Sequence, residues 1–501
     1  MTPATERAGM PSVAIITLGC GRNEVDSDQL AGLLGAGGVE VRDDPAAADV
    51  VIVNTCTFIE PAKQESIDTI LAACDLKGSS AAGVLVVGCM AQRYPQQLAD
   101  AIPEADAIVG FDAYPRLPAM VRDVAAGREV DRVVVARDPE PPPARPTLPL
   151  AAVTSSPDRL VLDLDAAERR PEPVVTAGQD GLDRVPASGP AFPVRAFNGG
   201  SWAYLKIASG CDRACTFCAI PSFRGRFRSR PADEIVAEAT WLADRGAKEL
   251  VLVSENTTSW GKDLGGGRDG QPELLRRLSD VDGVERLRLM YLQPAEITWP
   301  LLEAMAGLPR VASYFDLSLQ HAAPGVLNRM KRGGSPDHFL RLVREIRALD
   351  PTAVFRSNFI CGFPGETEQD VALLADFLAE ARLDWVGLFT FSVEDGTASA
   401  DLPDQVDHQE ALERLRSLAS LQEAIANEAA AAFVGRRIQV LVDETSDQET
   451  LARSYREAPE TDGEVRLVTA DGNAADLPVG RTLAATVVGS DGVDLVATVG
   501  R

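Results

Sequence analysis

Several residue types are scarce in this chain, and each scarcity excludes a class of protein. Eight cysteines in 501 residues are too few for a secreted disulfide scaffold, so a reducing compartment is expected. Three histidines offer no obvious acid–base pair. No apolar run reaches the ~20 residues of a membrane helix, and the first ten residues lack a basic-then-apolar export signal. We therefore expect a cytoplasmic protein with no membrane partner.

Positive charge is also scarce. The chain has 49 basic and 74 acidic residues, a net charge of −25. Such a chain repels nucleic acid unless a local basic patch overrides the average, although the same charge also describes an ordinary solubility surface. At this length, about two to four domains are expected.

The first region alternates strands with helices. Short β-branched runs of the kind buried in parallel sheets occur as SVAIITLG (12–19), ADVVIVNT (48–55), AGVLVVG (82–88) and DAIVG (106–110). Helical stretches lie at 24–34 and 61–73. The pattern predicts an α/β fold, an open parallel α/β sandwich, over residues 11–130.

Proline dominates residues 137–193, which include DPEPPPARPTLPL and RRPEPVVTAGQDG and are poor in aromatics. This composition predicts a mostly disordered linker, with an ordered surface insertion as the alternative.

Residues 197–430 are expected to form the next domain, in which a β-then-α rhythm repeats six times from Trp202 to about Asp395. The expected strands are AYLKIA (203–208), ELVLVSE (249–255), RLRLMYL (286–292), SYFDLSL (313–319), VFRSNFI (354–360) and WVGLFTF (385–391). Six such units predict a partial (β/α)6 barrel, two units short of the usual eight. A long helix is expected at 407–433.

The last region, residues 434–501, changes to alternating strands separated by Gly, Asp and Pro turns. The expected strands lie at 437–444, 463–468, 483–489 and 493–499. This pattern predicts a small β-barrel or sandwich. From residue 435 onward there are seven arginines and twelve acidic residues, so its net charge is −5.

Three cysteines are crowded at C-x3-C-x2-C, as Cys211, Cys215 and Cys218, directly after the first expected barrel strand. Barrel active sites form at this end of the strands. A structural zinc site needs four closed ligands, and a distant fourth cysteine would be required here. A four-iron cluster with three thiolate ligands instead keeps one iron open for another molecule.

Three more cysteines, Cys20, Cys56 and Cys89, each follow an expected strand of the first sheet. Taken singly, each fits a small buried apolar residue. Because the carboxyl ends of parallel strands share one edge, we expect all three to converge there as metal ligands. Cys74 and Cys361 fit neither group and are interpreted as packing residues.

The phrase ASGCDRACTFCAIPSFRGRFRSR, with its spacing and its place in the barrel, resembles the radical S-adenosylmethionine (SAM) enzymes and best the methylthiotransferase branch. The resemblance spans nearly the whole chain, including a C-terminal domain like the TRAM β-barrel. It implies two 4Fe–4S clusters, one on each cysteine trio, and SAM as cofactor. One SAM would chelate the open iron and yield a 5′-deoxyadenosyl radical, and another would supply the methyl group to sulfur at the auxiliary N-terminal cluster.

The resemblance also suggests residues for the SAM pocket. Glu255 and Asn256 follow the second barrel strand, although SENTTSW differs from the SQDTT-Y phrase common in this branch. Gly362 and Gly365 in CGFPGETEQD resemble the glycine-rich SAM turn, or serve only a tight turn before a capped helix.

Arg228 belongs to RGRFRSRP, which is expected to form one compact basic, aromatic patch of Arg224, Arg226, Arg228 and Arg230 beside Phe223 and Phe227. This patch is a candidate to bind a SAM carboxylate, an acidic protein loop or RNA, or is a plain solvated loop.

His321 in SLQH ends the fourth barrel strand and is a candidate contact to cofactor or substrate. Four features favour the branch that modifies an aspartate β-carbon of ribosomal protein S12. They are the cluster loop, SLQH, the TRAM segment SYREAPETDGEV and the acidic last region. An RNA-binding module should be basic. Thiomethylation of isopentenyl-adenosine in tRNA is the nearest alternative, and a non-catalytic iron–sulfur module for RNA binding or electron transfer is the other. Flavodoxin or ferredoxin is the expected electron donor.

Overall fold

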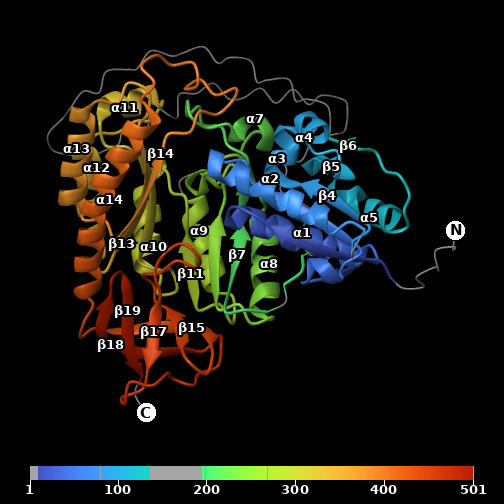
Figure 1. Cartoon of the computed structure of the whole chain (residues 1–501). Helices are drawn as coiled ribbons and strands as arrows, with labels where there is room; N and C mark the ends of the chain where they lie inside the picture. The colour runs from blue at the N-terminus through green and yellow to red at the C-terminus, as the bar shows by residue number, and fades with distance from the viewer. Residues whose placement is uncertain (1–9, 79–80, 136–194, 198, 268, 500–501) are drawn as a thin grey trace. The chain divides into compact units, whose positions relative to one another are not determined.

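The computed structural model describes residues 10–78, 81–135, 195–197, 199–267 and 269–499 (Figure 1). The expected linker at residues 137–193 lies outside the described residues. None of the helices in the described ranges combines the length and the apolar character needed to cross a bilayer.

A six-stranded parallel sheet forms the N-terminal region in the order β2-β1-β3-β4-β5-β6. All four expected strands are present. The two edge strands β2 and β6 have only three and two residues, too few to leave a readable pattern. The elements are β1 (Ser12–Thr17), α1 (Gly21–Ala36), β2 (Glu40–Arg42), η1 (Pro45–Ala47), β3 (Val50–Thr55), α2 (Glu60–Asp75), β4 (Gly83–Val87), α3 (Gly88–Arg93), α4 (Pro95–Ala101), β5 (Ala107–Val109), η2 (Phe111–Arg116), α5 (Leu117–Ala125) and β6 (Val133–Val134).

Helices cover both faces of this sheet, as the continuous apolar strands predicted. Alternate residues of β3 enter different cores, since Ile52 packs with Leu30 of α1, whereas Val53 packs with Ile70 of α2. The strand order changes direction between β1 and β3. Open parallel sheets bind ligands at such a switch point, beyond the carboxyl ends of the strands.

Six parallel strands, β7 and β10 to β14, form the central region in two three-stranded sheets. Isolated bridges, including Leu292 with Leu317, connect β11 to β12. Among the described strands β14 does not pair with β7, so the barrel is open, as predicted. The strands are β7 (Trp202–Lys206), β8 (Ala208–Ser209), β9 (Arg228–Ser229), β10 (Glu249–Val253), β11 (Arg286–Leu289), β12 (Tyr314–Gln320), β13 (Val354–Cys361) and β14 (Trp385–Thr390).

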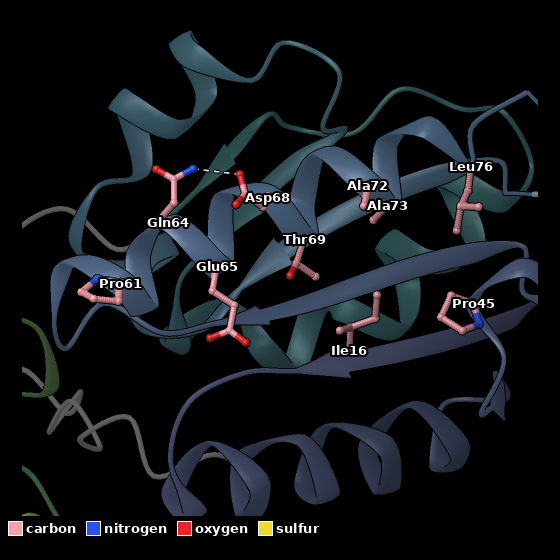
Figure 2. Close-up of a pocket in the computed structure, with 10 residues that line it drawn as sticks. All are labelled: Ile16, Pro45, Pro61, Gln64, Glu65, Asp68, Thr69, Ala72, Ala73 and Leu76. Atoms are coloured by element: carbon pink, nitrogen blue, oxygen red, sulfur yellow. Dashed lines mark hydrogen bonds between the residues drawn. The ribbon is translucent and has the colours of Figure 1, made fainter. Parts of the chain in front are cut away.

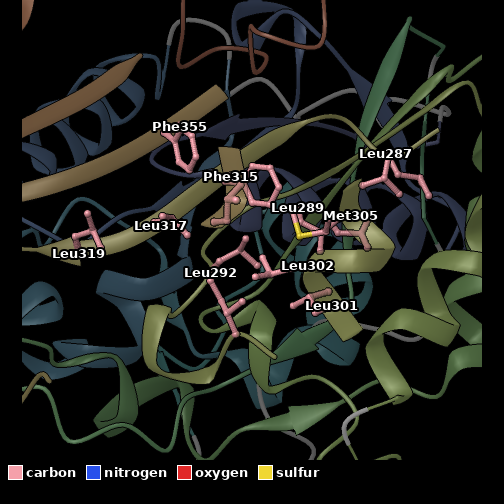
Figure 3. Packing of buried hydrophobic residues seen from close by; sticks show 14 of the residues in the cluster. Leu287, Leu289, Leu292, Leu301, Leu302, Met305, Phe315, Leu317, Leu319 and Phe355 are labelled. Carbon is pink, nitrogen blue, oxygen red and sulfur yellow. The ribbon is translucent and has the colours of Figure 1, made fainter. Parts of the chain in front are cut away.

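Helices pack outside these strands (Figure 1). The helices of the central region are α7 (Ile220–Arg224), α8 (Ala232–Ala243), η3 (Thr257–Ser259), α9 (Gly270–Ser279), η4 (Pro294–Glu296), α10 (Trp299–Gly307), α11 (Pro324–Arg329), α12 (Pro336–Leu349), α13 (Glu368–Ala381) and α14 (His408–Ala431). Figure 3 shows the main core, where Leu289 and Phe315 of the strands lie with Leu302 of α10. Removing this much apolar surface from water is the largest favourable contribution to the fold.

The opposite side chains of the same strands form a second cluster. Val251 and Tyr314 lie there with Val25 of α1 and Ala458 of the C-terminal region. All three regions of the chain therefore contribute to one buried cluster.

The C-terminal region is a closed five-stranded barrel in the order β15-β16-β17-β19-β18. The sequence predicted four of these strands and missed β16, whose four residues TLAR follow a polar turn directly. The strands are β15 (Arg437–Thr445), β16 (Thr450–Arg453), β17 (Val465–Val468), β18 (Thr482–Asp491) and β19 (Asp494–Val499). Arg453 of β16 donates to the buried Glu249 of β10 at 2.7 Å, which ties this barrel to the central strands.

Candidate active site

The three N-terminal cysteines lie at the carboxyl ends of neighbouring strands, as predicted. Cys20 caps the start of α1 after β1, Cys56 directly follows β3, and Cys89 lies in the first turn of α3 after β4. These three strands are adjacent in the sheet, and each thiol lies close enough to another to affect its pKa. The fold therefore brings together three residues that are far apart in sequence.

Two glycines allow the strand ends to approach so closely. Gly19 has a φ of +98°, and a Cβ there would lie 2.8 Å from the Sγ of Cys56. Gly88 has a φ of +90°, and a Cβ there would lie 2.6 Å from the carbonyl oxygen of Thr55. Both positions need glycine for its conformation and for its missing side chain.

Asn23 in the first turn of α1 links the three cysteine loops. Its Nδ2 donates to the carbonyl oxygens of Leu18, at 2.9 Å, and Thr55, at 3.1 Å, which precede Cys20 and Cys56. Its Oδ1 accepts from the Sγ of Cys89 at 3.6 Å. One buried amide thus fixes all three loops relative to each other.

Two arginines place positive charge beside this trio. The Nε of Arg22 donates to the Sγ of Cys20 at 3.5 Å, and the Nη2 of Arg224 donates to the Sγ of Cys89 at 3.2 Å. Burial raises the pKa of Cys20, but the two guanidinium groups and the backbone N–H of Asn23 lower it by more, so the net pKa lies below the ordinary value. This environment favours a thiolate at Cys20.

The other two thiols of the trio titrate differently. Burial, together with the neighbouring Cys20 and Cys89, raises the pKa of Cys56 to about 12. Burial also raises the pKa of Cys89, although Arg224 opposes it. Metal binding requires thiolates, so a bound metal would have to displace protons here.

The second trio lies on one loop that a short hairpin closes. Ser209 of β8 pairs with Arg228 of β9, and the N–H of Cys211 donates to the carbonyl oxygen of Gly225 at 3.1 Å. Gly210 has a φ of +78°, and a Cβ there would lie 2.1 Å from the carbonyl oxygen of Arg226. The loop is therefore compact around its three thiols.

Two arginines also flank this trio. The Nη1 of Arg332 donates to the Sγ of Cys215 at 3.6 Å, and its Nη2 donates to the carbonyl oxygen of Ser318. Arg213 lowers the pKa of Cys211 slightly, but burial dominates and raises it to about 11. Burial likewise raises the pKa of Cys218 to about 12.

Glu255 and Arg22 lie between the two trios. Arg22 lowers the pKa of both Cys20 and Cys218, so its charge reaches a thiol of each trio. Glu255 lies 3.7 Å from Arg22 and from Arg224, and it also raises the pKa of Cys211. Both of its carboxylate oxygens are buried with no hydrogen-bond partner among the described residues. A buried carboxylate with unused acceptors is suited to bind a donor group of a ligand.

A buried cluster of three charged side chains holds Arg224 in its position beside the N-terminal trio. Asp26 of α1 accepts from Lys206 at the end of β7 and from the Nη2 of Arg224 at 3.0 Å. All three side chains are at most 2% exposed. Leaving one of these charges unpaired would cost several kcal/mol, because buried ions lose their hydration.

Two other residues expected in the SAM pocket, Asn256 and Gly362, have contacts within the protein. Asn256 is buried, and its Nδ2 donates to the Oγ of Ser259 at 2.8 Å and to Glu296 at 3.1 Å. Glu296 also accepts from Arg213 of the cluster loop, so Asn256 supports that loop through Glu296.

Gly362 has a φ of +77° and packs against Ala411 of α14, where a Cβ would lie 2.4 Å from the alanine Cβ. The other glycine of this turn, Gly365, has a φ of +74° and lies beside the Arg329 side chain. The expected capping arrangement is confirmed, since Thr367 and Asp370 form a capping box at the start of α13. His321 is fully buried, its Nδ1 accepts from the N–H of Ala323 at 2.9 Å, and its Nε2 lies 3.3 Å from Glu366. The tight turn before a capped helix is therefore present, and the expected contacts of Gly362, Gly365 and His321 with a ligand stay predictions.

The expected basic surface segment does not form a single patch. Arg228 is exposed on β9 and Arg226 is exposed beside Asp212, but Arg224 is buried against Asp26. Arg230 instead donates to the buried Glu238 at 2.6 Å. The interpretation as one compact patch is therefore wrong for Arg224 and Arg230, because buried carboxylates pair with them.

Cys74 and Cys361 are buried in hydrophobic core clusters, in agreement with their interpretation as packing residues. A groove of about 770 Å3 lies over α2 and β1 (Figure 2). It is lined by Ile16, Pro61 and Thr69 with the acidic Glu65 and Asp68, and no cysteine of either trio lines it.

Each trio offers three thiols as donors. The thiols of Cys20, Cys56 and Cys89 lie close enough that one affects the pKa of another, and so do those of Cys211, Cys215 and Cys218. Thiolates are the usual ligands of iron–sulfur clusters, so the donor chemistry of both trios fits such a cluster.

Sequence reasoning missed several residues of this site. Asn23, Asp26 and Arg22 all lie in the GRNEVD segment directly after Cys20. Polar residues at the start of a helix are ordinary, and only the burial of Asn23 and Asp26 and the contact of Arg22 with the Cys20 thiol distinguish them here. Lys206 within an apolar strand was the one readable signal, because a buried lysine requires an anionic partner.

Three family models match the three regions of the chain. Residues 12–110 match the model described as uncharacterized protein family UPF0004, residues 205–378 match the radical SAM superfamily, and residues 434–499 match the TRAM domain. Among solved structures, the radical SAM methyltransferase TsrM from Kitasatospora setae has a TM-score of 0.49 at 17% identity and covers 76% of this chain and 72% of its own.

Relatives similar over their whole length are more informative. The ribosomal protein uS12 methylthiotransferase RimO of Nocardioides sp. (strain ATCC BAA-499 / JS614) is 46% identical and covers 97% of this chain and 96% of its own. The RimO of Cutibacterium acnes is 45% identical and covers 97% of each chain. At this identity and coverage, the chain belongs to the uS12 methylthiotransferase family of radical SAM enzymes.

Proposed function

We propose that this chain methylthiolates the β-carbon of an aspartate in ribosomal protein S12, using SAM both as radical source and as methyl donor. The observation that carries the proposal is the presence of two cysteine trios, each buried or half-buried, whose thiols share the charges of Arg22 and Glu255. The family to which the chain belongs supports the reaction and its protein substrate.

Each trio is proposed to hold one 4Fe–4S cluster. The radical SAM cluster would be held by Cys211, Cys215 and Cys218, and the auxiliary cluster by Cys20, Cys56 and Cys89. When bound, the radical SAM cluster and SAM supply hydrogen-atom abstraction, and the auxiliary cluster supplies the site for sulfur. The donor set fits these groups, since all six proposed ligands are soft thiols.

The chain's own residues have separate tasks in this proposal. Arg22 and Arg224 hold negative charge on the sulfur atoms of the N-terminal trio. Glu255 presents a buried carboxylate toward the space between the trios. Burial excludes water, which protects a reactive intermediate from quenching.

The choice of substrate rests on charge. The TRAM-like region carries a net charge of −5, which favours a basic protein over an RNA phosphate backbone. The acting compartment is proposed to be the cytoplasm, and flavodoxin or ferredoxin the electron donor.

The test uses anaerobically reconstituted protein with SAM and a strong reductant, incubated separately with S12 and with tRNA. Mass spectrometry is expected to detect replacement of one hydrogen by a methylthio group on S12 alone. Modification of tRNA alone would overturn the substrate assignment, and formation of deoxyadenosine with neither substrate modified would overturn the methylthiotransferase reaction.

A further inference from the structure

Arg224 is the last residue of α7, six positions after Cys218, yet its guanidinium lies among residues of the N-terminal region. Its Nη2 donates to the Oδ1 of Asn23 at 2.9 Å, to the Oδ2 of Asp26 at 3.0 Å and to the Sγ of Cys89 at 3.2 Å. A residue from the loop of one trio thus contacts a thiol of the other trio directly.

The surroundings hold Arg224 in this position. Its guanidinium carbon lies 4.9 Å from the ring centroid of Phe111, and its Nε lies 3.7 Å from Glu255. Planar guanidinium groups stack on aromatic rings and bond several acceptors at fixed angles, which a lysine cannot reproduce. The residue is 3% exposed, and its Nη1 is buried without a hydrogen-bond partner among the described residues.

Without the cysteines, the charges around Arg224 do not balance. Lys206, Arg22 and Arg224 contribute three positive charges, whereas Asp26 and Glu255 contribute two negative charges. The excess positive charge faces the thiols of the N-terminal trio, so negative charge on those sulfur atoms would complete the balance. Because a buried charge needs a partner, this side of the site is suited to an anionic group held by those thiols.

We propose that Arg224 is a positioning residue that supplies, from the loop of the radical SAM trio, a hydrogen bond and positive charge to the sulfur atoms of the cluster held by Cys20, Cys56 and Cys89. This inference rests on the proposed function, since it requires a cluster on those thiols. Net charge and N–H donors to sulfur help to set the reduction potential of a cluster. Arg224 therefore raises the potential of the N-terminal cluster and makes it dependent on the neighbouring loop.

The experiment compares Arg224→Gln and Arg224→Lys with a matched control, Arg226→Gln. Arg226 lies on the same loop, but its side chain is 74% exposed and its nearest acid is Asp212 at 3.6 Å. Both clusters are reconstituted, and electron paramagnetic resonance follows a redox titration of each. The signal that does not respond to added SAM is assigned to the N-terminal cluster.

The N-terminal midpoint potential is expected to be most negative in Arg224→Gln, intermediate in Arg224→Lys and unchanged in Arg226→Gln, while the SAM-responsive cluster titrates alike in all four proteins. Loss of the N-terminal iron in Arg224→Gln alone supports the same role. Unchanged potential and iron in both Arg224 variants would overturn this inference and leave the proposed function intact. A wild-type chain with iron on only one trio would overturn both.

Discussion

The two cysteine trios are built in opposite ways. Cys211, Cys215 and Cys218 lie within eight consecutive positions of one loop, which a hairpin closes. Cys20 and its two partners come from three strands and meet only because the sheet places those strands side by side. The first site is thus a property of a peptide segment, and the second is a property of a fold.

This difference has consequences for how each trio responds to change. The loop trio depends on Gly210, on Arg213 of the same loop and on Arg332 from later in the chain. The strand-end trio depends on the strand order, on Asn23 and on a buried ion cluster around Asp26. Damage to the fold should therefore affect the strand-end trio first.

The sharpest separation comes from removing one thiol of each trio. Cys215→Ala is expected to abolish SAM cleavage, because the open-iron cluster would lose a ligand. Cys56→Ala is expected to retain cleavage and lose methylthiolation entirely. Deoxyadenosine and methylthiolated substrate are measured in the same reaction. Full product formation by Cys56→Ala would contradict the division of labour.

A matched pair of glycines breaks each trio without removing a ligand. Gly19→Ala adds a Cβ 2.8 Å from the Cys56 Sγ, and Gly210→Ala adds one 2.1 Å from a carbonyl oxygen, each at a positive φ that alone costs about 1–2 kcal/mol. We expect Gly19→Ala to lose the iron of the strand-end trio and Gly210→Ala that of the loop trio. Iron analysis with SAM cleavage distinguishes them, and loss of the same cluster in both variants would refute the comparison.

The buried ion cluster of Asp26, Lys206 and Arg224 should make the strand-end trio's surroundings sensitive in the free energy of unfolding. Asp26→Asn leaves Lys206 and Arg224 buried without a carboxylate, so unfolding of the apo-protein should become easier by about 3–5 kcal/mol. Asp123→Asn, which breaks an exposed pair with Arg128 in the same region, should cost about 0–1 kcal/mol. Urea melts of both variants provide the measurement, and equal losses would show that Asp26 has no special role.

The loop trio has a weaker, pH-dependent support. Burial would raise the pKa of Glu296, but Lys262, Ser259 and Arg213 lower it to about 2 from 4.5. A carboxylate with a depressed pKa stabilises the fold above its unfolded pKa and loses this effect as the pH falls. Glu296→Gln should therefore destabilise the apo-protein by about 3 kcal/mol at neutral pH. The difference from wild type should shrink from pH ~4.5 toward ~2, and a difference independent of pH would contradict this.

The sequence predicted more of the fold than of the site. Long apolar strands were readable because burial imposes their composition, whereas β2, β6 and β16 were too short to show a pattern. The C-x3-C-x2-C spacing alone predicted the loop trio. The strand-end trio could be predicted only after a parallel sheet was expected, because its cysteines follow three separate strands.

The charged residues around the trios could not be predicted in the same way. Arg224 belongs to a run of alternating arginines that looks like a surface loop, and only the tertiary contact with Asp26 and Cys89 separates it from Arg226. Asn23 is one ordinary polar residue in a helix, and its three loop contacts exist only in the folded chain. Such roles are set by long-range packing, which a single sequence does not encode in a readable pattern.

Iron and sulfide analysis with electron paramagnetic resonance on anaerobically reconstituted wild-type protein tests the central claim most directly. The account predicts two four-iron clusters per chain, of which only one responds to SAM. Zinc in place of iron, or a single cluster, would contradict it.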